Sequence, residues 1–423
     1  MATRRGNRPL RRYLGPAVLG FVAIALVVVL AGLGAGSGPN ANTSPDPSGP
    51  GGPDGSGSFL VPTVAPTPTP VPPLGGTELY GFLPYWVMPE IDGRYLRRAP
   101  VSTLALFSVA AARDGTLRTG QLGYRRIVGE TGAGIIRAAH ERGMAVDLVF
   151  TSFGERRNER FFDRDGGGPA STDAPWQQTV EELVTLVDEL GLDGINVDIE
   201  RLDPLDRPAY TAFLITLGET LRASNPKARL SVATEASERG AGNAAAAVLG
   251  GVDRVFLMGY DYHWSGSAPG ASSPVDRLDG IPTLRRSIDW YVEAGVPRDR
   301  ILLGLPLYGM TWRTLGPDRS WPVVGTGIPW IPADNVDVLQ DEAFEPSRDS
   351  LEWAEFFAEP DGEEWLITYY DSPATLRAKL ALARDAGLAG GGFWALGYEI
   401  GLPGYRALIS DFRAGEIERD PLS

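Results

Sequence analysis

The chain has 423 residues, a hydrophobic content of 43% and a formal net charge of −14 at pH 7. The absence of cysteine excludes disulfides, thiol catalysis and thiolate metal sites, and two histidines, His140 and His263, are too few for a multi-histidine zinc site. The acidic balance argues against nucleic acid and anionic lipid as partners. The length allows two domains, or one large domain with appendages.

Residues 1–36 predict a membrane anchor. Five arginines precede an almost unbroken apolar run from Leu14 to about Leu33. A run of about 20 apolar residues spans a bilayer as a helix, and the arginines before it predict a cytoplasmic N-terminus. We therefore expect a single-pass cell-membrane protein whose main domain is extracellular. A signal peptide cleaved near residues 31–36 is the alternative, and it gives a secreted protein.

Residues 37–76 consist mainly of Gly, Ser, Pro and Thr, with few side chains that could form a core. The run Pro66–Pro73 predicts extended polyproline geometry, at roughly 3 Å per residue. We interpret 37–76 as a disordered linker between the membrane and the following domain, and 416–423 as a tail.

Strand and helix patterns alternate from residue 77 to about residue 415. The expected strands are Glu78–Trp86, Thr103–Ala110, Met144–Phe153, Gly191–Glu200, Leu230–Ala236, Val252–Tyr262, Ile301–Tyr308 and Gly391–Leu396. Amphipathic helices with typical start and stop signals are expected between them, among them Trp176–Leu190, Pro208–Ser224, Ile281–Ala294 and Ser372–Ala386. This alternation indicates an α/β fold, a (β/α)8 TIM barrel. An open doubly wound sheet is the alternative, but no glycine-rich phosphate turn follows the first strand.

The interval between the seventh strand and the next helix is too long for an ordinary barrel loop. It runs over about residues 311–369, is rich in Trp, Pro and Asp, and contains a further strand pattern at Trp365–Tyr370. We expect a small α+β insertion here, on the rim of the barrel and beside a cleft.

The fourth expected strand carries the strongest functional signal. Its polar residues Asn196, Asp198 and Glu200 alternate with branched aliphatic residues, so all three lie on one face. A buried face of this kind needs partners or a chemical role. An edge strand with one solvated face is the alternative, but the helical patterns on both flanks favour a barrel strand that carries carboxylates to its C-terminal end.

Barrel active sites lie at the C-terminal ends of the strands, and the other strands bring aromatic and acidic residues to that end. These residues are Tyr85, Trp86, Ser152, Glu235, Tyr260, Asp261, Tyr308 and Trp394. Aromatic rings stack on sugar C–H surfaces, and carboxylates move protons and stabilise an oxocarbenium-like charge, so the set predicts a carbohydrate site. We expect no metal and no cofactor.

Four segments resemble the motifs of glycoside hydrolase family 18, the chitinase family. Asp193–Glu200 resembles the fourth-strand signature Asp-Gly-x-Asp-x-Asp-x-Glu, and Met258–Tyr262 resembles the sixth-strand Met-x-Tyr-Asp. Gly304–Gly309 and Gly391–Trp394 are similar to the seventh and eighth strands of that family. The resemblance covers about residues 77–415, and the insertion matches the family's insertion in position.

The resemblance implies retaining, substrate-assisted hydrolysis of β-1,4 linkages next to N-acetylglucosamine, in chitin-type oligomers or in peptidoglycan. Glu200 would be the general acid and then the base. Asp198 would bind the acetamido N–H and stabilise the oxazolinium cation, and Tyr260 would hold the acetamido oxygen. An anionic Asp198 and partial burial would raise the pKa of Glu200.

The resemblance also implies residues that bind the sugar. Asp261 and Tyr308 would orient it at the cleavage point, and Trp394 would form the floor beneath it. We expect Tyr85 and Trp86 to add aromatic contacts. The implied partner is a polysaccharide that contains N-acetylglucosamine, and we expect a monomer.

Two segments depart from the family pattern. Asn196, counted here among the substrate-binding residues, replaces the middle Asp of the signature, which removes one acid but leaves the last two. Asn at this position is similar to what spore-cortex and peptidoglycan-directed members carry. Thr151–Gly154 resembles the third-strand Ser-x-Gly-Gly only loosely.

Three other functions use the same residues. A barrel glycosidase with two protein carboxylates would need Glu235, since the seventh strand offers no second Glu. A catalytically silent barrel would only bind glycan at the cell surface, although such relatives commonly lose the acid that Glu200 supplies here. A metal-dependent hydrolase would use Asp198, Glu200 and Asp261, without histidine ligands.

Overall fold

The computed structural model describes residues 77–417, apart from residues 165, 167–172, 278–279 and 281. The expected anchor (1–36), the expected linker (37–76) and residues 418–423 of the expected tail lie outside the described residues. Among the residues that are described, no helix is long and apolar enough to cross a membrane.

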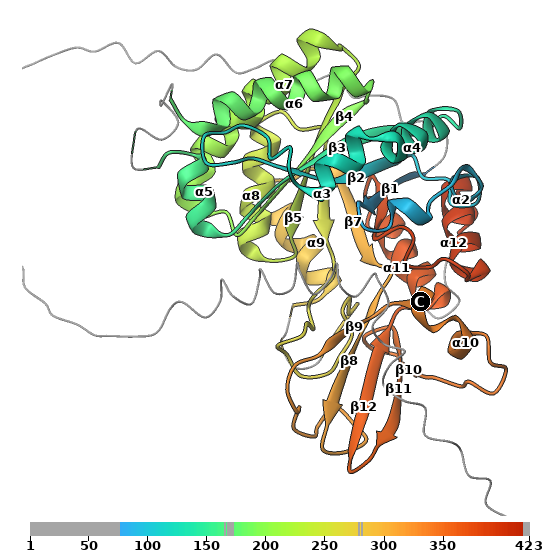
Figure 1. Ribbon diagram of the computed structural model, residues 1–423. Coiled ribbons are helices and arrows are strands. Elements are labelled where there is room, and N and C mark those ends of the chain that lie inside the picture. The colour runs from blue at the N-terminus through green and yellow to red at the C-terminus, as the bar shows by residue number, and fades with distance from the viewer. Residues whose placement is uncertain (1–76, 165, 167–172, 278–279, 281, 418–423) are drawn as a thin grey trace, which may run out of the picture.

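Eight parallel strands close into a barrel in the order β1-β13-β7-β6-β5-β4-β3-β2 (Figure 1). They are β1 (Glu78–Pro84), β2 (Thr103–Ala110), β3 (Ala145–Phe153), β4 (Gly194–Glu200), β5 (Arg229–Glu235), β6 (Arg254–Met258), β7 (Ile301–Pro306) and β13 (Gly390–Trp394). The closed barrel confirms the predicted architecture and excludes an open sheet. β4 pairs with β3 on one side and β5 on the other, so it is not an edge strand.

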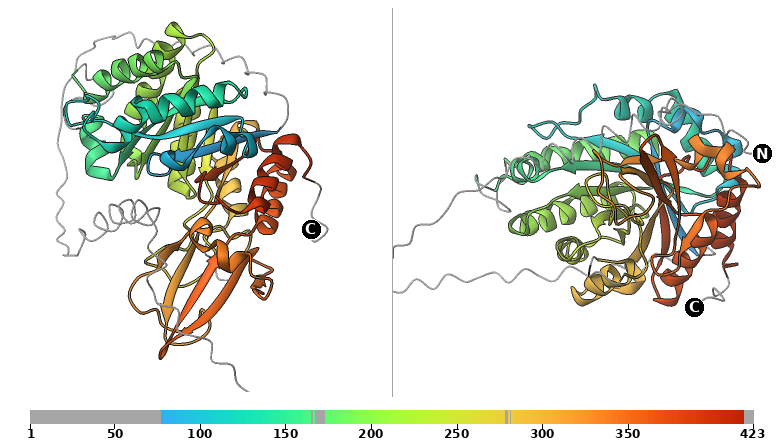
Figure 2. Two further views of the ribbon diagram at one scale, coloured as in Figure 1. Left: turned by 45° about the vertical axis from the view of Figure 1, so that its right-hand side comes forward. Right: turned by 90° about the horizontal axis from the view of Figure 1, so that it is seen from below.

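Helices surround the barrel, as Figures 1 and 2 show. They are α2 (Gly93–Arg98), α3 (Leu122–Val128), α4 (Glu130–His140), α5 (Glu155–Phe161), α6 (Pro175–Leu190), α7 (Arg207–Ser224), α8 (Glu238–Leu249), α9 (Leu284–Glu293), α11 (Pro373–Asp385) and α12 (Pro403–Ala414). α6 illustrates why the boundaries were predictable. Proline fits its first turn because no N–H is needed there, and Gly191 ends it in a left-handed conformation with φ of 64°.

Five strands end before the residue predicted from the sequence: β5 by one residue, β1, β7 and β13 by two, and β6 by four. β6 ends at Met258 and not at Tyr262, because the chain turns at once: the N–H of Tyr260 donates to the Met258 carbonyl at 2.9 Å. β1 and β7 end at Pro84 and Pro306, and one further inter-strand bond follows each proline, from the N–H of Tyr85 and of Leu307, each at 2.7 Å. The other predicted strand and helix ends agree with the structure within three residues.

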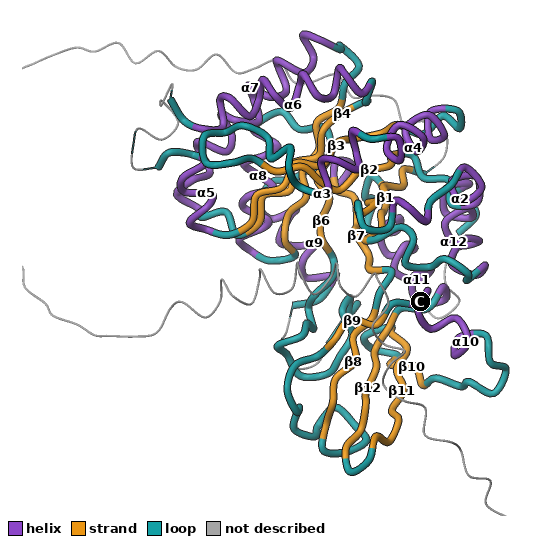
Figure 3. The backbone as a smooth tube through the Cα atoms, in the orientation of Figure 1, coloured by secondary structure: helices purple, strands orange, loops and turns teal. Residues whose placement is uncertain are grey.

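The interval after β7 forms a separate five-stranded antiparallel sheet in the order β10-β11-β12-β8-β9. Its strands are β8 (Gly309–Thr314), β9 (Ile328–Trp330), β10 (Ser347–Asp349), β11 (Ala354–Asp361) and β12 (Glu364–Tyr370), and one short helix, α10 (Val336–Leu339), accompanies them. Figure 3 shows this sheet projecting from one end of the barrel. It has its own small core, which includes Met310, Trp312 and Ile367.

The interior of the barrel is closed by aromatic rings. Phe82 and Phe256 pack edge to face with ring centroids 4.8 Å apart. Glycine in the neighbouring strands makes room for Phe256: a Cβ at Gly304 would lie 2.3 Å from its ring, and one at Gly392 would lie 2.5 Å from it. This packed layer leaves the polar ends of the strands as the place where a ligand can enter.

Candidate active site

The polar face of β4 enters the barrel as predicted. Asn196 is fully buried, Asp198 is 4% exposed, and Glu200 at the strand end is half-buried. The three side chains therefore climb from the barrel interior toward its C-terminal mouth. The strand alternation that predicted a shared face was correct.

Below Asp198, the interior holds a connected polar layer. The Asn196 amide donates to the Ser231 hydroxyl at 2.9 Å, and that hydroxyl lies 3.3 Å from the Tyr80 hydroxyl. Tyr80 donates to the Asp147 carboxylate at 2.8 Å, and Arg229 forms an ion pair with Asp147 at 3.5 Å. These contacts hold Asn196 in place at the bottom of the polar face, and Asp198 and Glu200 lie above it.

Three acids, Asp198, Glu200 and Glu235, form a cluster above that layer. Asp198 Oδ1 and Glu235 Oε2 are buried and have no hydrogen-bond partner among the described residues. The other Glu235 oxygen accepts from the Arg201 N–H at 2.6 Å. Buried polar atoms are normally paired, so unpaired oxygens at the mouth of a barrel indicate acceptors held ready for a ligand.

The surroundings of these acids favour their protonated forms. Burial, followed by the negative charges of Asp198, Glu235 and Asp261, holds the pKa of Glu200 well above its ordinary value. Burial and then the charge of Glu235 raise the pKa of Asp198 to about 8. This direction favours the protonated form of Glu200, which is the form that a general acid needs. The same direction at Asp198 favours its neutral form in the ligand-free site, whereas the sequence predicted an anionic Asp198.

The loop after β6 brings Tyr260 and Asp261 to the same mouth. The Tyr260 and Tyr308 rings meet edge to face at 6.3 Å, and the Tyr308 hydroxyl donates to the Asp261 carboxylate. Although Asp261 lies at the exposed rim, loss of water around its carboxyl raises its pKa to about 6. Tyr260 is half-buried, and burial raises the pKa of its hydroxyl, which stays a donor.

Two residues of this region adopt left-handed backbone conformations that are costly for side chains other than glycine. Arg201, directly after Glu200, has φ of 58°, and Asp261 has φ of 61°. The Asp261 N–H donates to the Ser272 hydroxyl at 3.0 Å, which helps to hold this conformation. Strained backbone concentrates at functional sites, and here it aims the ends of β4 and the β6 loop toward one another.

The predicted aromatic residues form a second group across the barrel mouth. β13 lies four strands from β4 in the closed order, so Trp394 faces Glu200 from the opposite side. Trp86 packs edge to face against Trp394 at 6.3 Å and donates to the Tyr398 hydroxyl at 3.2 Å. Tyr85 packs against Trp86 at 4.9 Å. Carboxylates and aromatic rings therefore occupy opposite walls of one mouth.

Sequence reasoning missed one residue of the site, Asn158. Ser152 lies at the C-terminal end of β3, as expected, and its hydroxyl donates to Asn158 at 2.8 Å. The fully buried Asn158 in turn donates to the Glu200 carbonyl at 2.8 Å, so it positions the end of β4. No sequence signal marks Asn158, because its role depends on α5 folding back onto β4. Glu235, named only for a rival mechanism, belongs to the cluster.

Within the described ranges, no group of three or more His, Asp or Glu residues could hold a metal ion. The metal-dependent alternative therefore lacks a ligand set in this part of the chain.

Comparisons with known proteins agree on one family. The sequence model described as glycosyl hydrolases family 18 matches residues 152–399. A cortical fragment-lytic enzyme of Bacillus subtilis is 25% identical over 317 residues, which cover 73% of this chain and 67% of that enzyme. A Bacillus subtilis protein described as a sporulation-specific glycosylase, YdhD, is 32% identical over 138 residues. The chain spans about a third of the length of YdhD, since that match covers 31% of it.

Solved structures share the fold. The spore cortex-lytic enzyme SleL of Bacillus cereus superimposes with a TM-score of 0.63 at 20% identity, covering 79% of this chain and 74% of SleL. An N-acetylglucosaminidase of Paenibacillus barengoltzii gives a TM-score of 0.63 at 20% identity, covering 79% of this chain and 99% of that one. At this level of identity the likeness supports the barrel and its insertion, while the site must be argued from its own residues.

Proposed function

The chain belongs to family 18 of the glycosyl hydrolases, and we propose that it is a glycosidase that cleaves β-1,4 linkages next to N-acetylglucosamine. One observation carries the proposal. Glu200 stands at the barrel mouth with its pKa raised by burial and by neighbouring acids, and Asp198 Oδ1 beneath it has no hydrogen-bond partner among the described residues. A protonated acid next to an open acceptor is what a substrate-assisted glycosidase needs.

In the first step, Glu200 gives its proton to the glycosidic oxygen while the bond from that oxygen to C1 breaks. The acetamido oxygen of the same sugar bonds to C1 and forms an oxazolinium ion, so the nucleophile belongs to the substrate. Asp198 Oδ1 is placed to accept the acetamido N–H. The cation that develops there favours the ionised form of Asp198, whose pKa is high only while the site is empty of positive charge.

In the second step, water attacks C1 and passes a proton to the Glu200 carboxylate, which restores the acetamido group and retains the anomeric configuration. Tyr260, with its hydroxyl kept protonated by burial, donates to the acetamido oxygen and holds it below C1. Asp261 and Tyr308 orient the sugar, and Trp394 stacks on it from across the mouth. Each role follows from the placement of these groups around one opening.

A silent glycan-binding barrel is the other function considered. Burial and like charge in the acid cluster cost folding stability, and a binding module has no use for that cost. The presence of Glu200 in its protonated form favours catalysis. We further propose that the N-terminal segment, which lies outside the described residues, anchors a monomeric enzyme at the outer face of the cell membrane.

The experiment compares the full-length chain with its Glu200→Gln variant on N-acetylglucosamine oligomers and on purified peptidoglycan. We expect the rate to fall about 10²-fold or more, because glutamine cannot give a proton to the leaving oxygen. Glycan binding is retained, since the shape of the site is kept. Glu219→Gln, on the exposed face of α7, is the matched control and keeps full activity.

Product analysis separates this mechanism from its rivals. Proton NMR of the first product formed should show the retained anomer, and substrates without the 2-acetamido group should resist cleavage. A glycosyl adduct trapped on Glu235, or an inverted product, would contradict the substrate-assisted route. Full activity of Glu200→Gln would contradict the role of Glu200.

A further inference from the structure

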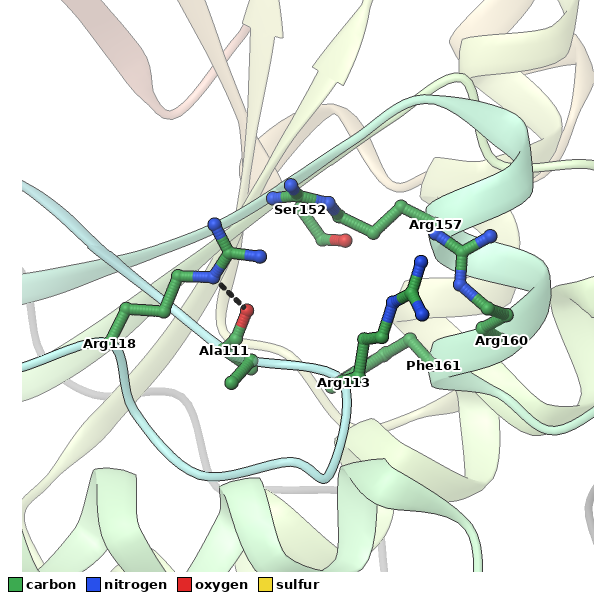
Figure 4. Close-up of a pocket in the computed structure, with 8 residues that line it drawn as sticks. Ala111, Arg113, Arg118, Ser152, Arg157, Arg160 and Phe161 are labelled. Carbon is green, nitrogen blue, oxygen red and sulfur yellow. Dashed lines mark hydrogen bonds between the residues drawn. The ribbon is translucent and has the colours of Figure 1, made fainter.

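A pocket of about 180 Å³ opens beside the acid cluster, and positively charged side chains surround it. Arg113 and Arg118 come from the loop after β2, and Arg157 and Arg160 come from α5 after β3. Ser152, at the end of β3, forms part of its wall. Figure 4 shows the four guanidinium groups arranged around one opening. We call this site the arginine pocket.

None of the four arginines forms an ion pair with a described carboxylate. Arg164, on the same segment of chain, does form ion pairs: it lies 2.6 Å from Asp206 and 2.9 Å from Glu159. The pKa of Arg157 is lowered by burial and then by the positive charges of Arg118 and Arg160. In a chain with net charge −14, four arginines gathered without acids are a site for an anion.

The arginine pocket and the acid cluster lie on neighbouring strands. Ser152 pairs with Ile199 across β3 and β4, and the next residue along β3 pairs with Glu200. Adjacent strands are about 5 Å apart. Asn158 links the two sites, because it accepts from Ser152 and donates to the Glu200 carbonyl. Both sites therefore lie at the C-terminal ends of neighbouring strands, within reach of one extended glycan.

We propose that the arginine pocket binds a carboxylate carried by the glycan, so the substrate is an acidic N-acetylated polymer of the peptidoglycan type. This inference rests on the proposed function. Guanidinium groups hold carboxylates through paired, charge-assisted hydrogen bonds. The volume is several times that of one water molecule, which occupies about 30 Å³, so it admits a carboxylate together with the group that bears it. A neutral chitin chain offers these arginines no counter-charge.

Two carboxylates of such a polymer fit this chemistry: the lactyl group on the sugar and the carboxylates of an attached peptide. Three substrates distinguish them. They are neutral N-acetylglucosamine oligomers, glycan strands of alternating N-acetylglucosamine and N-acetylmuramic acid without peptide, and the same strands with peptide attached.

The test compares the full-length chain with the double variant Arg157→Gln/Arg160→Gln. We expect kcat/KM to fall about 10-fold to 100-fold on acidic strands, mainly through KM, and to change less than about twofold on neutral oligomers. A fall only on the peptide-free strands assigns the lactyl carboxylate, because the peptide-bearing strands have that group tied up in an amide bond. A fall only on the peptide-bearing strands assigns the peptide, and a fall on both shows that the pocket accepts either carboxylate. Arg137→Gln, on the exposed face of α4, is the control and changes neither.

An equal loss on neutral and acidic substrates, or no loss on either, would overturn the proposal. Arg157→Lys keeps the charge but not the paired geometry, and an intermediate KM on acidic strands is expected for it. Calorimetric binding to Glu200→Gln separates this inference from the proposed function. If the chain cleaves nothing but acidic strands still bind through Arg157 and Arg160, the pocket stands and the proposed reaction fails.

Discussion

Two polar layers inside the same barrel differ in how their charges are balanced. In the lower layer, buried Asp147 accepts from Tyr80 at 2.8 Å and lies 3.5 Å from the Arg229 guanidinium. Asp147 Oδ1 makes no hydrogen bond but lies against that guanidinium, whereas in the upper layer Asp198 and Glu235 each have a buried oxygen with no hydrogen bond and form no ion pair with a described cation. Asp147 and Asp198 are 1% and 4% exposed, so burial alone does not distinguish these two acids.

The difference separates a structural polar group from a functional one. The lower layer supplies a cation and a hydroxyl to its acid, which is how a folded chain tolerates a buried charge. The upper layer supplies only further acids, and burial together with their charges raises the pKa of Asp198 and of Glu200. Substitutions in the two layers should therefore change stability in opposite directions, and the predictions below test that contrast.

The largest effect is expected in the lower layer, for Arg229→Met. Without the guanidinium, Asp147 becomes an unpaired buried acid, and the free energy of unfolding should fall by about 3 kcal/mol. The loss should grow as pH rises, because burial already raises the pKa of Asp147 and Arg229 opposes that rise. Urea unfolding at pH 5 and pH 8 measures it.

The control for that prediction is an exposed ion pair. Arg285 lies 2.9 Å from Asp276 with half of each side chain exposed, so Arg285→Met should cost less than about 1 kcal/mol. Equal losses for the two variants would mean that the lower layer is no more structural than the surface.

The second effect is a gain in stability from Asp198→Asn. The folded-state pKa of Asp198, about 8, lies above its unfolded value, so its contribution is full at low pH and is lost as pH rises through 8. Asparagine avoids that loss and should raise the free energy of unfolding by about 2 kcal/mol at pH 8, with no gain near pH 4. Thermal melts across this range measure it, and turnover should fall in parallel. A variant that is destabilised at pH 8 would contradict the contrast.

The sequence predicted the residues of the lower polar layer less well than those of the upper layer. Period-two alternation placed Asp198 and Glu200 on one face, and the strand ends placed Tyr260, Tyr308 and Trp394 at one mouth. These are local patterns, and a barrel brings strand ends together whatever its loops do. The family resemblance, now supported by the family model, supplied the roles.

What the sequence could not predict depends on the partners that folding supplies. Whether an acid is paired is decided by residues far along the chain, as with Asp147 and Arg229, so the protonated state of Asp198 was not foreseen. The arginine pocket joins the β2 loop to α5 and leaves no periodic signal. The early end of β6 followed from a turn at Gly259 whose hydrogen bonds are visible only in three dimensions.

The third effect is expected for Glu235→Gln, which tests the role of Glu235 in the upper layer. The negative charge of Glu235 raises the pKa of both Asp198 and Glu200, so its removal lets Glu200 lose its proton at lower pH. The basic limb of the kcat/KM profile should move to lower pH by about one unit or less, while kcat at the optimum stays within about tenfold of the parent. Loss of all activity at every pH would instead make Glu235 a reacting group.

The smallest effect is expected where the two layers meet, for Asn196→Asp, which restores the acid of the family signature. Asn196 is fully buried and donates to Ser231 at 2.9 Å, and a protonated carboxyl can make the same bond. Stability near pH 4 should therefore change by less than about 1 kcal/mol. As pH rises the new acid must stay protonated beside Asp198 or ionise without a cation, so the variant should lose stability relative to the parent above neutral pH. Turnover should stay within about tenfold, because Asp198 and Glu200 remain in place.

Melts and rates across pH 4 to 9 test this, with Asn225→Asp in the exposed turn after α7 as the matched control. A 10²-fold gain in turnover would instead show that Asn196 lowers the activity of the enzyme. Residue 196 would then belong to the upper layer, with the catalytic acids.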